Sequence, residues 1–188
     1  LGAAALGALL LAAAPANADF TPYIIRDANT APYDAPAINT TASTTEFLIT
    51  EGGQKAGFGS DDINGSTIGS ITDLYIHRID DRTRFTAGSG PAVAPYLNFW
   101  ITDGTHFAVV ANEPSDGVFQ ALYSNGYDLS YADLADKPAK IFETDDKSWL
   151  PNNGVGLTFA DLKDYVILSP TLAQFTTLTG TTTGAPWD

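Results

Sequence analysis

The chain has 188 residues, a formal net charge of −13 and no cysteine. A surface this acidic repels phosphate backbones and anionic lipids, so we expect neither nucleic acid nor a membrane surface as a partner. The lack of cysteine excludes disulfide scaffolds, thiolate metal sites and cysteine nucleophiles. Hydrophobic residues make up 44% of the chain, which is enough for a globular core.

The N-terminal segment has the composition of a secretory signal peptide. Residues 1–14 are apolar and uncharged, and the segment ends in Ala16-Asn17-Ala18, an A-x-A cleavage pattern. The apolar run is short for a membrane span. We therefore expect export, with an incomplete signal peptide over residues 1–18 that is cleaved before Asp19, and no membrane span in the mature chain. The alternative is an alanine-rich buried helix.

The remaining chain is dominated by short β-type segments with glycine, proline, asparagine and aspartate between them. Strands are predicted over residues 23–25, 46–50, 67–79, 165–168 and 174–180, with a hairpin over residues 95–114. Residues 51–66 are predicted to form a glycine-rich loop. Helical turns are expected over residues 130–135 and after Thr158, where Asp161 is near the capping-box position.

This order of elements predicts an all-β fold, because strands do not alternate with long helices. We expect an antiparallel β-sandwich of the jelly-roll or concanavalin type with one or two short helical turns. Residues 19–188 are expected to form a single domain of this kind, which the sequence cuts short after Asp188.

The hairpin over residues 95–114 is the most informative stretch. Its centre is Asp103-Gly104, a signal for a two-residue type I′ turn, which needs positive φ at both positions. If that turn closes the hairpin, Thr102 pairs with Thr105 and Trp100 pairs with Phe107. Opposed residues share a face, and faces alternate along each strand.

Each face of the predicted hairpin then has its own character. The core face carries Leu97, Phe99, Ile101, Ala108 and Val110, with His106 at its end. The second face carries Tyr96, Asn98, Trp100, Thr102, Phe107 and Val109. This face is aromatic and amphipathic, whereas the outer face of an edge hairpin is usually polar.

Two interpretations of the second face remain open. In the first, Tyr96, Asn98, Trp100 and Phe107 form a carbohydrate platform on which sugar rings stack while polar side chains bond their hydroxyl groups. In the second, Trp100 and Phe107 are a packed cross-strand pair beneath a loop.

The segment "SDDING" resembles the first half of a calcium-binding loop. Its twelfth position is Ile71, where an EF-hand requires a bidentate acid, so the EF-hand interpretation fails. A different calcium site built from Asp61, Asp62 and Asn64 is still possible because hard oxygen ligands crowd on this loop. The alternative is a turn rich in aspartate and asparagine, with a glycine in the left-handed region.

Catalytic patterns are weak. The chain contains only two histidines, His77 and His106, and no G-x-S-x-G motif, so neither a zinc site nor a serine hydrolase is indicated. A glycoside hydrolase needs two acids that face each other across a cleft. Candidate acids are Glu46, Glu51, Asp103, Glu113 and Glu143, but no two of them alternate along one strand.

From the "SDDING" loop to "NEPSD", including "APYLNFWITDGTHFAVVANEPSD", the chain resembles secreted bacterial proteins of the PEP-CTERM type. Many of these are similar to concanavalin-like jelly rolls. The resemblance implies export and association with the cell surface or matrix, and it implies no catalytic residues. The Pro-Glu-Pro sorting tail of the family is not found in these 188 residues.

The sequence therefore predicts an exported, non-catalytic surface or matrix protein. Its expected ligand is an extracellular polysaccharide, with no cofactor other than a possible calcium ion. The alternatives on the same scaffold are a polysaccharide-active hydrolase or lyase, and a purely structural component of a surface layer or biofilm.

Overall fold

The computed structural model describes residues 19–74, 79, 96–112, 117–119, 129–144 and 146–179. Its strands are β1 (Thr21–Arg26), β2 (Ala37–Thr40), β3 (Thr45–Leu48), β4 (Lys55–Gly59), β5 (Asn98–Thr102), β6 (Phe107–Ala111), β7 (Lys140–Phe142) and β8 (Val166–Ile167). Its helices are α2 (Tyr131–Leu134) and α3 (Leu172–Thr179), with short 3₁₀ helices η1 (Ile68–Ser70), η3 (Gly117–Phe119), η4 (Pro151–Gly154) and η5 (Phe159–Leu162). All pairings between these strands are antiparallel, which confirms the predicted all-β class.

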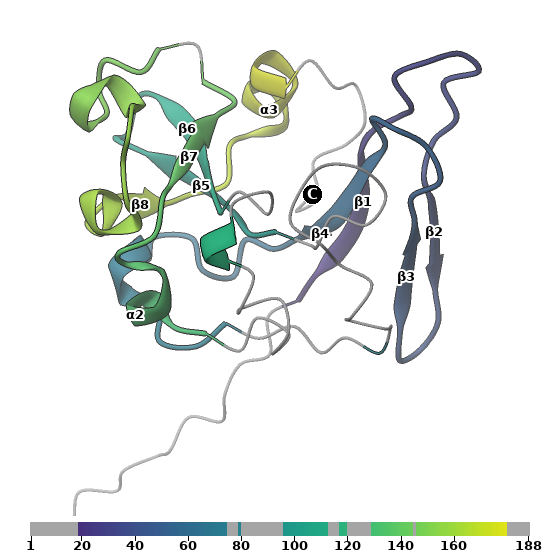
Figure 1. Cartoon of the computed structure of the whole chain (residues 1–188), viewed down its shortest axis with the longest axis horizontal. Coiled ribbons are helices and arrows are strands. Elements are labelled where there is room, and N and C mark those ends of the chain that lie inside the picture. The colour runs from purple at the N-terminus through teal and green to yellow at the C-terminus, as the bar shows by residue number, and fades with distance from the viewer. Residues whose placement is uncertain are drawn as a thin grey trace, which may run out of the picture.

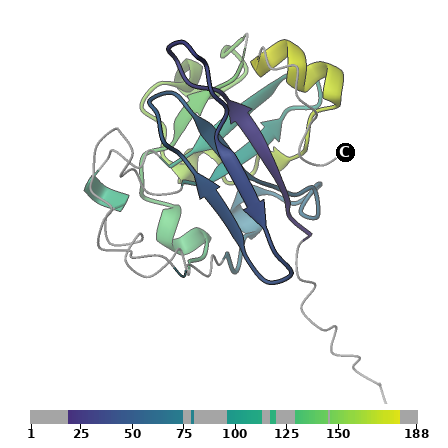
Figure 2. The ribbon, with the colours of Figure 1, turned by 90° about the vertical axis from the view of Figure 1, so that its right-hand side faces the viewer.

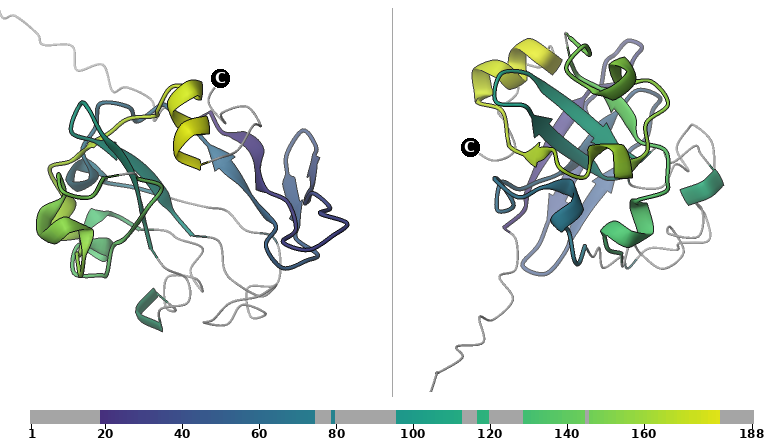
Figure 3. Two further views of the ribbon diagram at one scale, coloured as in Figure 1. Left: turned by 90° about the horizontal axis from the view of Figure 1, so that it is seen from above. Right: turned by 90° about the vertical axis from the view of Figure 1, so that its left-hand side faces the viewer.

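The strands form three sheets (Figure 1). Two of them are the pairs β1–β4 and β2–β3, and the third is a four-stranded sheet in the order β7-β6-β5-β8. Figure 2 shows that the β1–β4 pair lies in front of the four-stranded sheet and that its strands run across those of the sheet. Seen from above, the four-stranded sheet lies between the short helices on one side and the β1–β4 pair on the other (Figure 3).

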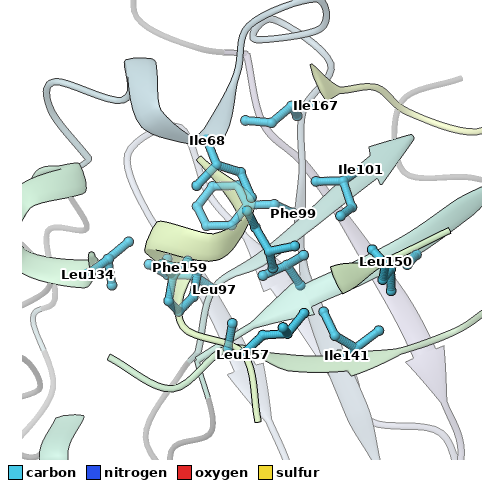
Figure 4. Packing of buried hydrophobic residues seen from close by; sticks show 14 of the residues in the cluster. Ile68, Leu97, Phe99, Ile101, Leu134, Ile141, Leu150, Leu157, Phe159 and Ile167 are labelled. Carbon is cyan, nitrogen blue, oxygen red and sulfur yellow. The ribbon is translucent and has the colours of Figure 1, made fainter. Parts of the chain in front are cut away.

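The core lies between the four-stranded sheet and the short helices. The predicted core face is confirmed, since Leu97, Phe99, Ile101, Ala108 and Val110 are all buried. Ile68 of η1, Leu134 of α2 and Phe159 of η5 belong to the same cluster, and Figure 4 shows them with Leu97, Phe99 and Ile101 of the sheet. Full burial of one such side chain contributes about 1.5–3 kcal/mol, so this cluster accounts for much of the stability of the fold.

Both predicted helical turns are present, and each begins with a capping box. The carboxylate of Asp133 accepts bonds from Ser130 N and Oγ at 2.7 and 3.0 Å, just before α2. The carboxylate of Asp161 likewise accepts bonds from Thr158 N and Oγ1, both at 2.8 Å, just before η5. The bonds from the backbone amides, together with those from the hydroxyl groups, lower the pKa of both carboxyls.

The predicted register of the central hairpin is wrong by two residues. Thr102 pairs with Phe107 and Trp100 with Val109, so the loop has four residues instead of two. Gly104 has a φ of +96°, but Asp103 does not have the positive φ that a type I′ turn needs. A shift of two keeps every side chain on its predicted face, because faces alternate with a period of two.

Several other boundaries follow the prediction. Residues 23–25 lie within β1, residues 46–48 within β3, and the strand predicted over residues 165–168 contains β8. The structure corrects two segments near the middle of the chain. The predicted glycine-rich loop contains β4, which pairs with β1, and the strand predicted from Thr67 begins instead with η1.

The third correction concerns the C-terminal segment, where a strand was predicted over residues 174–180. Those residues, as far as Thr179, belong to α3. Gln174 Oε1 accepts bonds from Thr171 N and Oγ1, both at 2.9 Å, and Thr171 Oγ1 accepts a bond from Gln174 N. These bonds form a T-x-x-Q capping box, and they explain why a segment rich in threonine begins a helix.

In the described part of the chain, no helix has both the length and the apolar character that crossing a membrane would require.

Candidate functional site

The second face of the central hairpin is largely covered. Phe107 and Val109 are buried, and Trp100 is partly buried. The ring of Trp100 meets that of Phe175 in α3 edge to face, with 6.0 Å between ring centroids. Figures 1 and 3 show α3 between the four-stranded sheet and the β1–β4 pair, on the side of this face.

The other two predicted platform residues lie towards the start of β5. Tyr96 is half-buried, and Lys55 Nζ of β4 stands 6.0 Å from the centre of its ring. Burial, together with the neighbouring Tyr96, raises the pKa of Tyr23 in β1 to about 12. Asn98 is exposed. The structure therefore does not gather the four predicted residues in one place: Trp100 and Phe107 lie near α3, Tyr96 lies beside Lys55 of β4, and Asn98 is exposed.

The end of the hairpin is a polar loop fixed by side chains. Asp103 Oδ1 accepts bonds from the backbone amides of Thr105 and His106, both at 2.8 Å. Thr102 Oγ1 donates to the carbonyl of His106 at 2.6 Å and accepts from Gly104 N at 2.9 Å. These bonds satisfy the backbone groups of a four-residue loop, and this is the physical reason for the change in register.

His106 was predicted at the end of the core face, but it lies in this loop and is about one-third exposed. Its Nδ1 lies 3.1 Å from Asp103 Oδ2. Because an ionised carboxylate can only accept, Nδ1 carries the proton in this contact. Its Nε2 lies 3.9 Å from Asp146 Oδ2, and the imidazole stacks on the ring of Trp149 with 6.1 Å between centroids and 20° between planes.

The segment around Trp149 is held rigidly against the core. Trp149 Nε1 donates to the carbonyl of Asp146 at 2.8 Å, and Tyr165 Oη donates to the carbonyl of Trp149 at 3.2 Å. Ser148 N and Oγ bond to the carboxylate of Asp146 at 2.7 and 2.9 Å. The histidine is thus placed by fixed neighbours on both sides.

Both carboxylates beside His106 are ionised at neutral pH. Bonds from the amide and side chain of His106, and from the amide of Thr105, lower the pKa of Asp103 to about 2. Bonds from Ser148, first from its amide and then from its hydroxyl group, lower the pKa of Asp146. Burial, with the nearby charge of Asp103, raises the pKa of Tyr165.

A pocket of about 300 Å³ opens between this loop and α3. It is lined by Thr105, His106, Phe107, Ala173, Gln174, Thr177 and Leu178; we call it the hairpin-end pocket. The Oε1 atom of Gln174 is already bonded to Thr171, so the amide NH₂ group remains to donate to a ligand. An aromatic ring, an amide, two hydroxyl groups and an imidazole therefore surround one small space.

The predicted calcium loop is a tightly bonded turn in this structure. Asn64 Oδ1 accepts bonds from Ser169 N and Oγ, at 2.9 and 3.2 Å. Asp62 Oδ2 accepts bonds from the amide of Asp19 and the hydroxyl of Ser60, and Asp61 is exposed. Gly65 has a φ of +85°, as such a turn requires. In the described ranges, no three histidine or acidic side chains are grouped closely enough to hold a metal ion.

The candidate acids for hydrolysis are dispersed. Glu46 lies exposed on β3, where Asn39 Nδ2 donates to it at 3.1 Å, and Glu51 lies exposed in a turn. Glu113 and the second histidine, His77, lie outside the described residues. Glu143 follows β7 with a φ of +53°, and burial raises its pKa, although Lys55 and Arg26 oppose this change.

Sequence reasoning missed the contribution of α3 and of the segment 146–149 to this site. The T-x-x-Q pattern of Thr171 and Gln174 was the one local signal for α3. Nothing local in the sequence predicts that Trp149 stacks on His106, because the two residues are brought together by the order of strands in the sheet.

The fold and site together define an all-β protein with a small polar pocket at the end of a central hairpin. Comparison with protein-family models, with curated proteins and with solved structures found no match. The function is therefore argued from the pocket itself.

Proposed function

We propose that this chain is an exported, non-catalytic surface or matrix protein that binds a polysaccharide through the hairpin-end pocket. The proposed scaffold is a β-sandwich related to the jelly rolls. Export is proposed from the signal-like residues 1–18, and surface association from the resemblance to PEP-CTERM-type proteins.

The observation that carries the binding proposal is the composition of the pocket. Its volume of about 300 Å³ is at the lower end of the range for ligand pockets, which suits one sugar unit of a longer chain. Phe107, Ala173 and Leu178 offer apolar surface to the C–H groups of a sugar ring. Thr105 and Gln174 offer hydrogen bonds to its hydroxyl groups, as sites for amphipathic ligands require.

The protonation states of the acidic side chains near the pocket support binding better than hydrolysis. A glycosidase needs one carboxylic acid that is protonated at working pH, which requires a raised pKa. Both acids beside His106 have lowered pKa values instead. Glu143 has a raised pKa, but the charged groups that act on it are Lys55 and Arg26, not a second acid. The same two ionised carboxylates favour neutral or amine-bearing sugars over uronic acids.

We expect Gln174→Glu to weaken oligosaccharide binding about tenfold or more, since the change removes the amide donor and adds a negative charge to the pocket. Glutamate preserves the capping box of α3, so the helix should still form. Binding is measured by calorimetry with oligosaccharides that a glycan array identifies for the wild type from neutral, amine-bearing and uronic-acid sets.

Asn98→Asp is the matched control, because it makes the same chemical change at an exposed position on the predicted platform, outside the pocket. It should bind as the wild type does. If Asn98→Asp loses affinity and Gln174→Glu does not, the platform and not the pocket is the site. A wild type that binds no glycan in any set contradicts the proposed function.

A further inference from the structure

The first described residue is bonded to a carboxylate 43 residues away in the sequence. Asp19 N lies 2.5 Å from Asp62 Oδ2, and both residues are exposed. Ser60 Oγ donates to the same oxygen at 3.2 Å and accepts from Asp62 N at 3.3 Å. The loop itself therefore fixes the direction in which this carboxylate points.

The sheet brings Asp19 to this loop. Thr21, the first residue of β1, pairs with Gly59, the last residue of β4. Next to this pair, the ring of Phe20 meets that of Phe58 edge to face, with 6.2 Å between ring centroids. Strand register and ring contact together hold the backbone of Asp19 beside the Ser60–Asp62 turn.

The proposed cleavage point falls at the same nitrogen atom. Asp19 and Phe20 are exposed and precede the first strand, so cleavage before Asp19 removes no residue of β1. Hydrolysis of the Ala18–Asp19 bond by a signal peptidase consumes one water molecule, leaves a carboxylate on Ala18 and frees the amino group of Asp19. At neutral pH this α-amino group takes up a proton, since its usual pKa is about 7.7–8.0.

We propose that Asp62 is the receiving site for the amino group that processing before Asp19 creates. This inference rests on the export step of the proposed function. Removal of residues 1–18 then changes a neutral amide donor into an ammonium group without moving it. A charge-assisted hydrogen bond is about twice as strong as a neutral one, so processing strengthens the link between β1 and the loop after β4.

The test places a factor Xa recognition sequence at residues 15–18 of the full chain, so that cleavage leaves Asp19 as the first residue. Melting is followed before and after cleavage. We expect cleavage to raise the Tm by about 0.5–4 °C, the range for one exposed ion pair in a chain of this size. Asp62→Asn should abolish this increase.

Asp61→Asn is the matched control, because it removes the same charge from the adjacent residue, whose side chain does not accept the hydrogen bond from Asp19 N. It should keep the increase. An unchanged increase in Asp62→Asn, an equal loss in Asp61→Asn, or no increase in the wild type contradicts the proposal.

N-terminal sequencing of the exported product distinguishes cleavage before Asp19 from binding of the new amino group by Asp62. A product that begins at a residue other than Asp19 overturns both the processing step and the capture by Asp62. A product that begins at Asp19, combined with an unaltered response of Asp62→Asn, overturns the capture alone. Glycan binding is measured separately on the same protein, so a failure of the proposed binding function is distinguished from a failure of either step.

Discussion

Phe159→Ala is expected to destabilise the protein by about 3–5 kcal/mol, the usual cost of removing a large aromatic side chain from a packed core. Phe159 is fully buried at the first position of η5, within the cluster that includes Leu134 and Ile68 (Figure 4). For a chain of this size, such a loss lowers the Tm by about 6–20 °C. Thermal melting followed by near-UV circular dichroism measures it.

Val155→Ala is the control for this prediction. Val155 lies just after η4 and is 65% exposed, so its truncation should change stability by less than about 0.5 kcal/mol. Equal melting temperatures for the two variants would mean that the short helices do not cover the sheet as described. The core would then lie elsewhere, and other elements would cover the two faces of the hairpin.

Asp103→Ala is expected to destabilise the protein by about 1–2 kcal/mol, as loss of a side chain that caps backbone amides usually does. Its carboxylate accepts two backbone bonds and holds His106. Because Asp103 is about one-third exposed, water can replace part of what is lost. Asp103→Asn should cost less, since the amide oxygen can still accept the bonds from Thr105 and His106. Chemical denaturation of the three proteins at neutral pH gives these differences.

The same residue gives a pH dependence with a defined sign. The pKa of Asp103 falls from 3.8 to about 2 on folding, so its contribution to stability is complete above about pH 5. That contribution is lost as the pH falls towards 2, where the folded protein also takes up the proton. The stability difference between the wild type and Asp103→Asn should therefore shrink as the pH falls from 4 to 2. A difference that persists unchanged at pH 2 contradicts the role assigned to this carboxylate.

The fold class and the faces of the hairpin could be predicted from sequence because both depend on local periodicity. Successive side chains of a strand point to opposite faces, so Phe99 and Val110 stay on the core face for any change of register by an even number of residues. The loop length itself could not be read from Asp103-Gly104. It depends on side-chain bonds from Thr102 and Asp103 that the dipeptide alone does not reveal.

The misassigned elements share a different cause. β4 has the sequence Lys-Ala-Gly-Phe-Gly, which has low intrinsic strand propensity, and it is a strand because β1 pairs with it. In α3, threonine residues resemble a strand locally, while the capping box and the burial of Phe175 against Trp100 favour a helix. In both segments, tertiary contacts override propensity.

The candidate site was predictable only in part. Phe107 belongs both to the predicted platform and to the hairpin-end pocket. Gln174 and Thr177 could not be associated with it, because their helix was predicted as a strand. The pairing of His106 with Asp146 and Trp149 depends on how a distant loop packs beside the hairpin, and no local pattern encodes that.

Binding in the hairpin-end pocket is tested most directly by titrating the ¹⁵N-labelled protein with an oligosaccharide that the glycan array identifies. The backbone amide chemical shifts are followed during the titration. If the oligosaccharide binds in the hairpin-end pocket, the largest changes fall on the lining residues Thr105, His106, Phe107, Gln174 and Thr177. Changes centred on Tyr96 and Asn98, or spread evenly over the β1–β4 pair, would show that the hairpin-end pocket is not the binding site.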